Sequence, residues 1–351
     1  MSRQSPAILP GCSFTRPGRP IHTCRDIPLS MNPVSAIYLR MPNWIGDVCM
    51  SLPSLEAALG TGLPVVVCAR AWARDLLSGY GLAGFVEMKG RWREDRAAVH
   101  AFRKKAAHAH PRGLLLPDSL SSAMVFNFAG VPSAGYRDDG RSLILRWPVP
   151  KPADDLHAVE SWYHLTGHAL RRWGCAAPPP RPSRQLGLRL TERHRAEAGH
   201  ALEAAGLTEG DFVLVAPTAT GLHKGQVKVW PYFDELVRRL QQAGHTVVMC
   251  PPASEAEAAR ANAPTAVCLP PMKLGGFATL TQLAGLVICN DSGVSHLAAA
   301  AGAQQITLFG VTHYERTGPW SSHATCLGSA RAWPTLDEVE EHALTTLQLQ
   351  Y

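Results

Sequence analysis

Three short segments of the sequence combine residue types that can move a proton or bind a phosphate. Each segment follows an apolar run typical of a strand and precedes a stretch typical of a helix. In the first, residues 41–53, Gly46 permits a tight turn and Asp47 follows it near the start of the expected helix. A carboxylate there can accept a proton from a hydroxyl group. It can equally cap the helix, so the spacing leaves both interpretations open.

The second segment, residues 217–231, is rich in hydroxyl groups, glycines and lysines. Such a loop suits phosphate binding, because backbone N–H groups and ammonium groups can converge on an anion. It is not a Walker A motif, because the sequence Gly-Lys-Ser/Thr is absent. An ordinary basic loop is the alternative interpretation. The candidate phosphate ligands are Thr218, Thr220, Lys224 and Lys228.

The third segment, residues 290–300, reads Asn-Asp-Ser-Gly-Val-Ser-His-Leu-Ala-Ala-Ala. It runs from a strand through a glycine-bearing turn into an alanine-rich helix. Backbone N–H groups from Ser292 onward would point at an anion, and the helix dipole would favour it. His296 would lie beside this anion site, although a lone histidine is more often structural.

The elements that must position these segments alternate between strands and helices. In the first half we expect strands at 36–39, 65–68, 85–88 and 114–116, and helices at 51–59 and 93–109. The second half repeats the rhythm, with strands at 212–216, 246–250, 266–269, 286–289 and 305–309 and a helix at 231–243. This alternation predicts an α/β fold of two Rossmann-like domains with parallel sheets, whose ligands bind at the carboxyl ends of the strands.

The proline distribution predicts the domain boundaries. Residues 176–183 read Ala-Ala-Pro-Pro-Pro-Arg-Pro-Ser, which cannot continue a helix. We therefore expect a linker at 176–185 between domains at 35–175 and 186–351, with a capping box at Thr335 opening a C-terminal helix. Residues 1–34 hold six prolines and no apolar core of the kind a signal peptide needs, and are predicted to be a disordered arm.

Composition narrows the class of protein. No apolar run approaches the ~20 residues of a membrane span, and nine cysteines without a Cys-x-x-Cys pair are typical of reduced cytosolic thiols. Residues 1–180 carry 21 Lys and Arg against 13 Asp and Glu, a net charge of +8, whereas residues 181–351 carry −2. The basic half suggests an anionic partner, such as a membrane surface, a phosphorylated glycolipid or nucleic acid; a merely soluble surface is the alternative.

Taken together, the segments resemble the ADP-heptose:lipopolysaccharide heptosyltransferase family, glycosyltransferase family 9. The family's Gly-Asp pair after the first strand is matched by Trp44-Ile-Gly46-Asp47. Its Lys-x-Trp-Pro element is matched by Lys228-Val-Trp-Pro231, and its Asp-Thr/Ser-Gly-x-x-His element by Asp291-Ser-Gly-Val-Ser-His296. Weaker matches lie around Glu257 and in Pro271-Met272-Lys-Leu274. The motifs occur in the family's order, over roughly residues 35–330.

The resemblance implies a GT-B type fold, with the acceptor on the first domain and the nucleotide sugar on the second. It implies ADP-heptose as donor, with Lys228 neutralising the diphosphate, Glu257 binding the ribose and Met272 lining the adenosine pocket. Glu255 competes with Glu257 for the ribose. Asp291, Ser292, Gly293 and His296 would contact the donor. The loop at 218–228 is longer than usual, which leaves open whether Thr218, Thr220 or Lys224 touches phosphate.

The resemblance also implies a mechanism and a location. Asp47 would be the general base, in a loop with Asn43, Trp44 and Gly46 on the acceptor side, and direct displacement would invert the anomeric carbon. No cofactor or metal is expected, because the chain lacks Asp-x-Asp and its histidines show no metal-ligand spacing. The acceptor would be the lipid A-core at the inner membrane surface, bound by a cytoplasmic, peripheral enzyme that does not bind nucleic acid. The alternatives are another acceptor or sugar within the family, a nucleotide-sugar epimerase, and a non-catalytic nucleotide-sugar binding protein.

Overall fold

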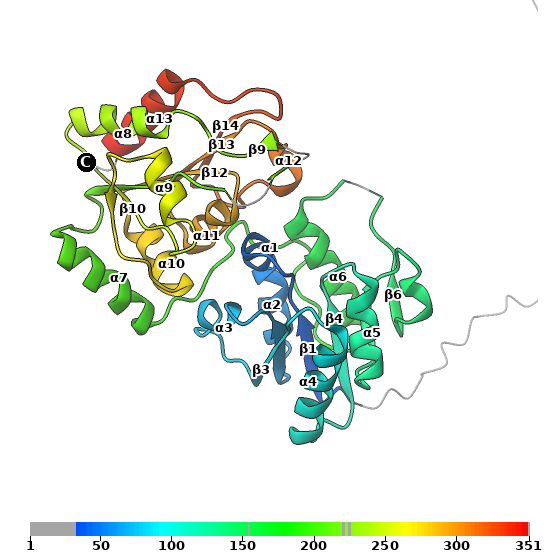
Figure 1. Ribbon diagram of the computed structural model, residues 1–351. Coiled ribbons are helices and arrows are strands. Elements are labelled where there is room, and N and C mark those ends of the chain that lie inside the picture. Colours follow the sequence, from blue (N-terminus) through cyan, green and yellow to red (C-terminus); the bar gives the residue numbers. More distant parts are fainter. Residues whose placement is uncertain (1–32, 154, 220–221, 224–225, 350–351) are drawn as a thin grey trace, which may run out of the picture. The chain divides into compact units, whose positions relative to one another are not determined.

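The computed structural model describes residues 33–153, 155–219, 222–223 and 226–349 and contains two parallel six-stranded sheets (Figure 1). By their contacts the residues from Pro33 onward belong to one unit. We call the part from β1 to α6 the first half and the part from α7 to α13 the second half.

The first half is built on the strand order β3-β2-β1-β4-β5-β6, with every pair parallel. Side chains of β1 alternate between its two faces: Ile37 and Leu39 join one core cluster, and Ala36 and Tyr38 join another. Both faces are therefore covered, which explains the unbroken apolar run of β2. The elements are β1 (Ala36–Arg40), α1 (Ile45–Met50), α2 (Leu52–Leu59), β2 (Val65–Ala69), α3 (Ala73–Leu76), β3 (Gly84–Glu87), α4 (Trp92–Lys105), β4 (Pro111–Leu115), α5 (Leu120–Phe128), β5 (Ser133–Tyr136), the 3-10 helix η1 (Arg141–Leu143), β6 (Trp147–Val149) and α6 (Ala158–Arg172).

The second half repeats this arrangement with the order β11-β10-β7-β12-β13-β14. Val213 and Val215 of β7 pack on one face, and Phe212 and Leu214 on the other. A small antiparallel pair, β8 (Leu222–His223) and β9 (Gln226–Val227), stands apart from this sheet. The remaining elements are α7 (Glu192–Ala205), β7 (Phe212–Ala216), α8 (Phe233–Gln242), β10 (Thr246–Met249), α9 (Ala256–Asn262), β11 (Val267–Cys268), α10 (Leu274–Leu283), β12 (Leu286–Asn290), α11 (Gly293–Ala301), β13 (Gln305–Phe309), α12 (Tyr314–Thr317), β14 (Ala324–Gly328) and α13 (Leu336–Gln348).

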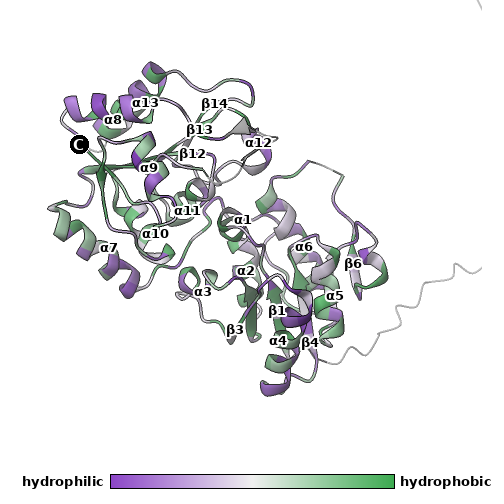
Figure 2. Ribbon diagram, in the orientation of Figure 1, coloured by the Kyte–Doolittle hydropathy of each residue, from purple (hydrophilic) through white to green (hydrophobic). Residues whose placement is uncertain are grey.

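The predicted strand–helix alternation and parallel sheets are confirmed. Figure 2 shows hydrophobic residues concentrated in the strands and hydrophilic residues on outer helices such as α7 and α8. Thr335 caps α13, since its side chain accepts a hydrogen bond from the backbone N–H of Glu338. The order of strands and helices in both halves was therefore predicted correctly from the sequence.

Several predicted boundaries are wrong. A separate helix, α1, precedes the one expected at 51–59. The helix expected at 93–109 ends at Lys105, because the backbone of Ala107 is left-handed with φ 52°. The strand expected at 114–116 spans Pro111–Leu115, and the helix expected from 231 begins at Phe233. Strands β5, β6 and β14 were not predicted.

Side-chain hydrogen bonds connect the two halves. The backbone N–H of Gly275 in α10 donates to Oδ2 of Asp75 in α3 at 2.9 Å. Ser78 Oγ lies 3.2 Å from Nε2 of His194 in α7. Between α6 and α7, the segment with the proline-rich stretch contains no helix or strand. The contacts between the halves, rather than this segment alone, therefore hold α1 against the second half.

Candidate active site

The first component of the site is Asp47, in the first turn of α1. The residue at the N-cap position is Trp44, with no side-chain capping bond, so the capping interpretation of Asp47 is wrong. The Asp47 side chain is half-buried, and among the described residues no group donates a hydrogen bond to it. Burial raises its pKa above the ordinary value of 3.8. A carboxylate with no donor of its own is free to accept a proton.

The start of α1 packs directly against the start of α11. A Cβ atom added to Gly46 would lie 2.5 Å from Cδ2 of His296, and one added to Gly293 would lie 3.3 Å from Cβ of Ile45. Only glycine allows these two helices to approach so closely. The packing places Asp47 one residue beyond the contact between the halves.

The second component is the start of α11, which follows the buried strand β12. Ser292 is its N-cap, and Ser292 Oγ accepts a hydrogen bond from the backbone N–H of Val294 at 3.3 Å. His296 in this helix is 6% exposed, and its Nδ1 has no hydrogen-bond partner among the described residues. Burial lowers the pKa of His296 to about 4, so the ring is neutral at pH 7. The helix start and an unpartnered ring nitrogen thus lie together.

Asn290, at the end of β12, holds both ends of the loop that carries Lys228. Its Oδ1 accepts a hydrogen bond from the backbone N–H of Trp230 at 2.9 Å, and its Nδ2 donates to the carbonyl oxygens of Ala216 and Thr218 at 3.4 Å each. Since Asn290 is fully buried, these bonds do not compete with water. They fix Lys228, which lies two residues before Trp230.

Lys228 is paired in this structure. Its Nζ lies 2.9 Å from Oδ2 of Asp291, which is 8% exposed. The hydroxyl of Thr312 donates to the same oxygen at 2.7 Å. A positive charge, a neutral histidine and a helix N-terminus are therefore gathered beside the start of α11, where they can stabilise an anion.

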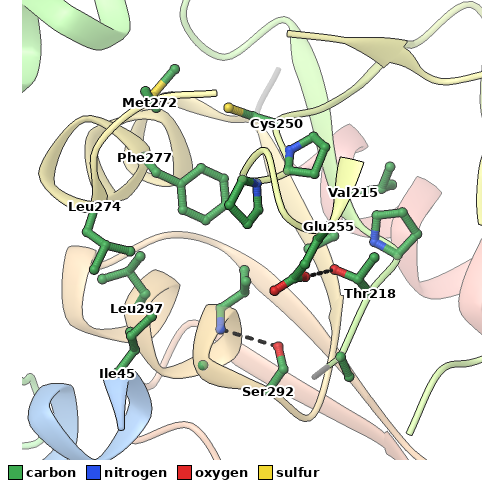
Figure 3. Close-up of a pocket in the computed structure, with 17 residues that line it drawn as sticks. Ile45, Val215, Thr218, Cys250, Glu255, Met272, Leu274, Phe277, Ser292 and Leu297 are labelled. Atoms are coloured by element: carbon green, nitrogen blue, oxygen red, sulfur yellow. Dashed lines mark hydrogen bonds between the residues drawn. The ribbon is translucent and has the colours of Figure 1, made fainter. Parts of the chain in front are cut away.

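A pocket lies between residues that follow the second sheet's strands and the start of α11 (Figure 3). Met272, Leu274 and Phe277 make its apolar end. In its middle, Thr218 Oγ1 donates to Oε2 of Glu255 at 2.5 Å. Its other lining residues include Ile45, Ser292 and Gly293. An elongated ligand with an apolar ring at one end and an anion at the other fits this sequence of surfaces.

Some of the predicted site residues line the pocket and others lie outside it. Thr218, Met272, Ser292 and Gly293 line the pocket. Glu257 lies in the first turn of α9 and is not among the lining residues, whereas Glu255, the N-cap of that helix, is. On the acceptor side, Asn43 Oδ1 accepts a 2.7 Å hydrogen bond from Arg40, and Trp44 is 74% exposed. Thr220 and Lys224 lie outside the described residues. Sequence reasoning missed Ile45, Asn290 and Thr312.

Comparison with known proteins decides the family. The model of glycosyltransferase family 9 (heptosyltransferase) matches residues 99–347. The chain belongs to this family. Lipopolysaccharide heptosyltransferase 1 of Pseudomonas aeruginosa PAO1 is 35% identical over 328 residues, which cover 89% of this chain and 81% of the relative. Lipopolysaccharide heptosyltransferase 2 of Escherichia coli K12 is 27% identical over 323 residues, covering 81% and 85%.

Solved structures show the same fold for this family 9 glycosyltransferase. E. coli ADP-heptose lipopolysaccharide heptosyltransferase II superposes with a TM-score of 0.71 at 24% identity, covering 90% of this chain and 99% of that one. E. coli heptosyltransferase WaaC with ADP gives 0.70 at 21% identity, covering 89% and 99%. The GT-B prediction is confirmed. Among the described residues, no helix is long and apolar enough to cross a membrane, and no three metal-ligating side chains cluster.

Proposed function

We propose that this family 9 glycosyltransferase transfers heptose from ADP-heptose to the inner core of lipopolysaccharide with inversion at the anomeric carbon. One observation carries the proposal. Gly293 and Ile45 line the pocket and pack on each other, and Asp47 lies two residues beyond Ile45 in α1. A carboxylate without a hydrogen-bond donor therefore lies two residues from the lining of the pocket. One neighbour of the same fold supports the identity of the donor, since E. coli heptosyltransferase WaaC was solved with ADP and with ADP-2-deoxy-2-fluoro heptose.

The proposed donor lies along the pocket with its adenine against Met272, Leu274 and Phe277. The ribose hydroxyls bind Glu255, whose carboxylate already accepts a hydrogen bond from Thr218 in the middle of the pocket. We prefer Glu255 to Glu257 for this role, because only Glu255 lines the pocket. The diphosphate then reaches the start of α11, with Lys228 beside it.

In the proposed reaction, Asp47 takes the proton from an acceptor hydroxyl as its oxygen attacks the anomeric carbon. The new carbon–oxygen bond forms on the face opposite ADP while the bond to the β-phosphate oxygen breaks, which inverts the configuration. Lys228 and the N–H groups at the start of α11 stabilise the charge on the departing ADP. This role needs neither a metal nor a cofactor.

We place the acceptor, a phosphorylated glycolipid at the cytoplasmic face of the inner membrane, on the first half. Residues 1–180 carry the +8 charge excess, which attracts an anionic acceptor. Trp44 lies next to the base region with most of its side chain in water, where it can contact a sugar or a lipid.

The test is transfer with the purified full chain, ADP-heptose and two lipid acceptors, one without heptose and one that already carries a single heptose. Mass spectrometry should show the gain of one heptose on one of the two, which also assigns the core position. UDP-glucose serves as a control donor and should give no product. ADP release without a mass gain on either acceptor would overturn the proposed acceptor, and the absence of ADP binding would overturn the donor.

A further inference from the structure

Two donors share one carboxylate oxygen beside the proposed diphosphate site. Asp291 Oδ2 accepts from Lys228 Nζ at 2.9 Å and from Thr312 Oγ1 at 2.7 Å. A carboxylate only accepts hydrogen bonds, so the Thr312 hydroxyl must donate. Within the described residues no hydrogen bond reaches the other oxygen, Oδ1.

The backbone holds Thr312 and Asp291 in register. Asp291 follows β12, and its N–H donates to the carbonyl of Leu308 in the neighbouring strand β13. Gly310, just after β13, lies so close to Trp333 that an added Cβ would be 2.1 Å from its ring. The segment carrying Thr312 is therefore packed in place, and its hydroxyl meets a nearly buried carboxylate.

We propose that Thr312 is a positioning residue that keeps Lys228 available to the donor diphosphate. Two donors on one oxygen divide its negative charge, so each bond is weaker than it would be alone. With the Thr312 hydroxyl present, Lys228 is held by Asp291 yet can turn an N–H toward a second anion. Without it, the ammonium would be the sole donor to Oδ2 and would bind Asp291 more tightly. This inference rests on the proposed donor site.

The experiment compares Thr312→Val, which removes the hydroxyl and keeps the shape, with Thr312→Ser, which retains it. Binding of ADP and of AMP is measured by calorimetry, because only ADP places a β-phosphate near Lys228. We expect Thr312→Val to weaken ADP binding by about five- to tenfold, the scale of one ordinary hydrogen bond, and to lower kcat similarly. AMP binding and the thermal midpoint should stay at wild-type values.

Thr312→Ser should restore ADP binding to within about twofold, since the donated hydrogen bond returns. Thr317→Val in α12 is the matched control, because Thr317 is exposed and makes no side-chain hydrogen bond with a described residue. In a Lys228→Ala background, Thr312→Val should change ADP binding little.

Two results would overturn the inference. One is an equal loss of ADP and AMP affinity with a lowered thermal midpoint, which means that Thr312 only supports the fold. The other is an undiminished effect in the Lys228→Ala background, which means that Thr312 does not act through that lysine. If the wild-type chain bound no ADP, the donor proposal would fail instead; if it bound ADP normally and Thr312→Val matched it, only this inference would fail.

Discussion

Asp47 in the first half and Asp291 in the second both lie at the start of a helix that packs against the other half. The strand orders β3-β2-β1-β4-β5-β6 and β11-β10-β7-β12-β13-β14 correspond strand for strand. In each half the aspartate follows one of the two central strands, β1 or β12, where the order reverses and α/β folds bind ligands. The two carboxylates therefore both follow a central strand of their sheet, although these strands are not equivalent, since β1 corresponds to β7 and β12 to β4.

Their hydrogen bonds differ. Asp291 accepts from Lys228 and Thr312, whereas no described group donates to the carboxylate of Asp47. A carboxylate that already holds two donors can position a cation but is a poor base, and one without donors can take a proton. The hydrogen-bond partners of these two aspartates, more than their places in the fold, therefore decide their chemistry.

Replacing Asp47 by asparagine should lower turnover by roughly 10²–10⁴-fold, the usual contribution of a positioned base. The amide keeps the size but cannot take the proton, so ADP affinity should be unchanged in calorimetry. Since burial raises the pKa of Asp47, the wild-type rate should fall with decreasing pH sooner than an exposed aspartate would allow. Near-normal turnover of the variant would show that Asp47 is not the general base. The proposed difference in role between Asp47 and Asp291 would then be wrong.

Replacing Lys228 by alanine should lower turnover by at least about tenfold, because losing a hydrogen bond between charged groups costs about 1.5–3 kcal/mol. The nearly buried Asp291 also loses its counter-charge. Steady-state kinetics measures the effect, with Lys273→Ala, a lysine outside the paired cluster, as control. An unaffected kcat would mean that Lys228 serves only Asp291. Lys224→Ala is expected to act mainly on donor affinity.

The next change, Gly46→Ala, tests the contact between the halves. The new Cβ would press on the His296 ring, and overpacking of this kind typically costs about 1–3 kcal/mol. The free energy of unfolding from urea titration should fall by that amount, and turnover should fall with it. Gly199→Ala in α7 is the control, since its Cβ would meet nothing within 4 Å. Equal stability of both variants would show that α1 and α11 separate easily.

The sequence was a good guide wherever local pattern decides the structure. The bounds of β7 and β13 were predicted to the residue, because β7 is an unbroken apolar run and β13, Gln-Ile-Thr-Leu-Phe, ends directly before Gly310. β5, with the sequence Ser-Ala-Gly-Tyr, was missed because small residues give little strand signal. Its pairing with β4 and β6 comes from the tertiary structure.

In the site, too, local motifs predicted some residues, whereas others depend on the tertiary structure. Motifs located Asp47, Lys228 and Asp291, which the structure places at helix starts and on the loop before Trp230. No local pattern could identify Thr312, because its bond to Asp291 depends on the register of β12 with β13. The choice between Glu255 and Glu257 depends on where α9 begins, and helix starts are poorly fixed by sequence.

The His296 ring should make stability depend on pH. Its pKa is lowered to about 4 in the folded state, against about 6.5 in an unfolded chain. Between these values the unfolded chain binds the proton more readily, so the free energy of unfolding should fall as pH drops from about 6.5 toward 4, by roughly 2–3 kcal/mol. Urea titrations of wild type and His296→Gln would measure it. Burial also lowers the pKa of His157 and His194. The contribution of His296 is therefore the difference in the free energy of unfolding between wild type and His296→Gln at each pH. The prediction would be contradicted if the free energy of unfolding had the same pH dependence in wild type and in His296→Gln.

A chelator should have almost no effect on the rate of transfer. Transfer should continue unchanged in saturating EDTA, because Lys228 and the N–H groups at the start of α11 supply the positive charge that a divalent cation gives other transferases. The charge on the leaving group would then be stabilised by the second half alone. Adding Mg²⁺ or Mn²⁺ to the untreated enzyme should likewise leave kcat unchanged. A rate that EDTA abolished and either ion restored would mean that a metal, and not the Lys228–Asp291 pair, carries the diphosphate.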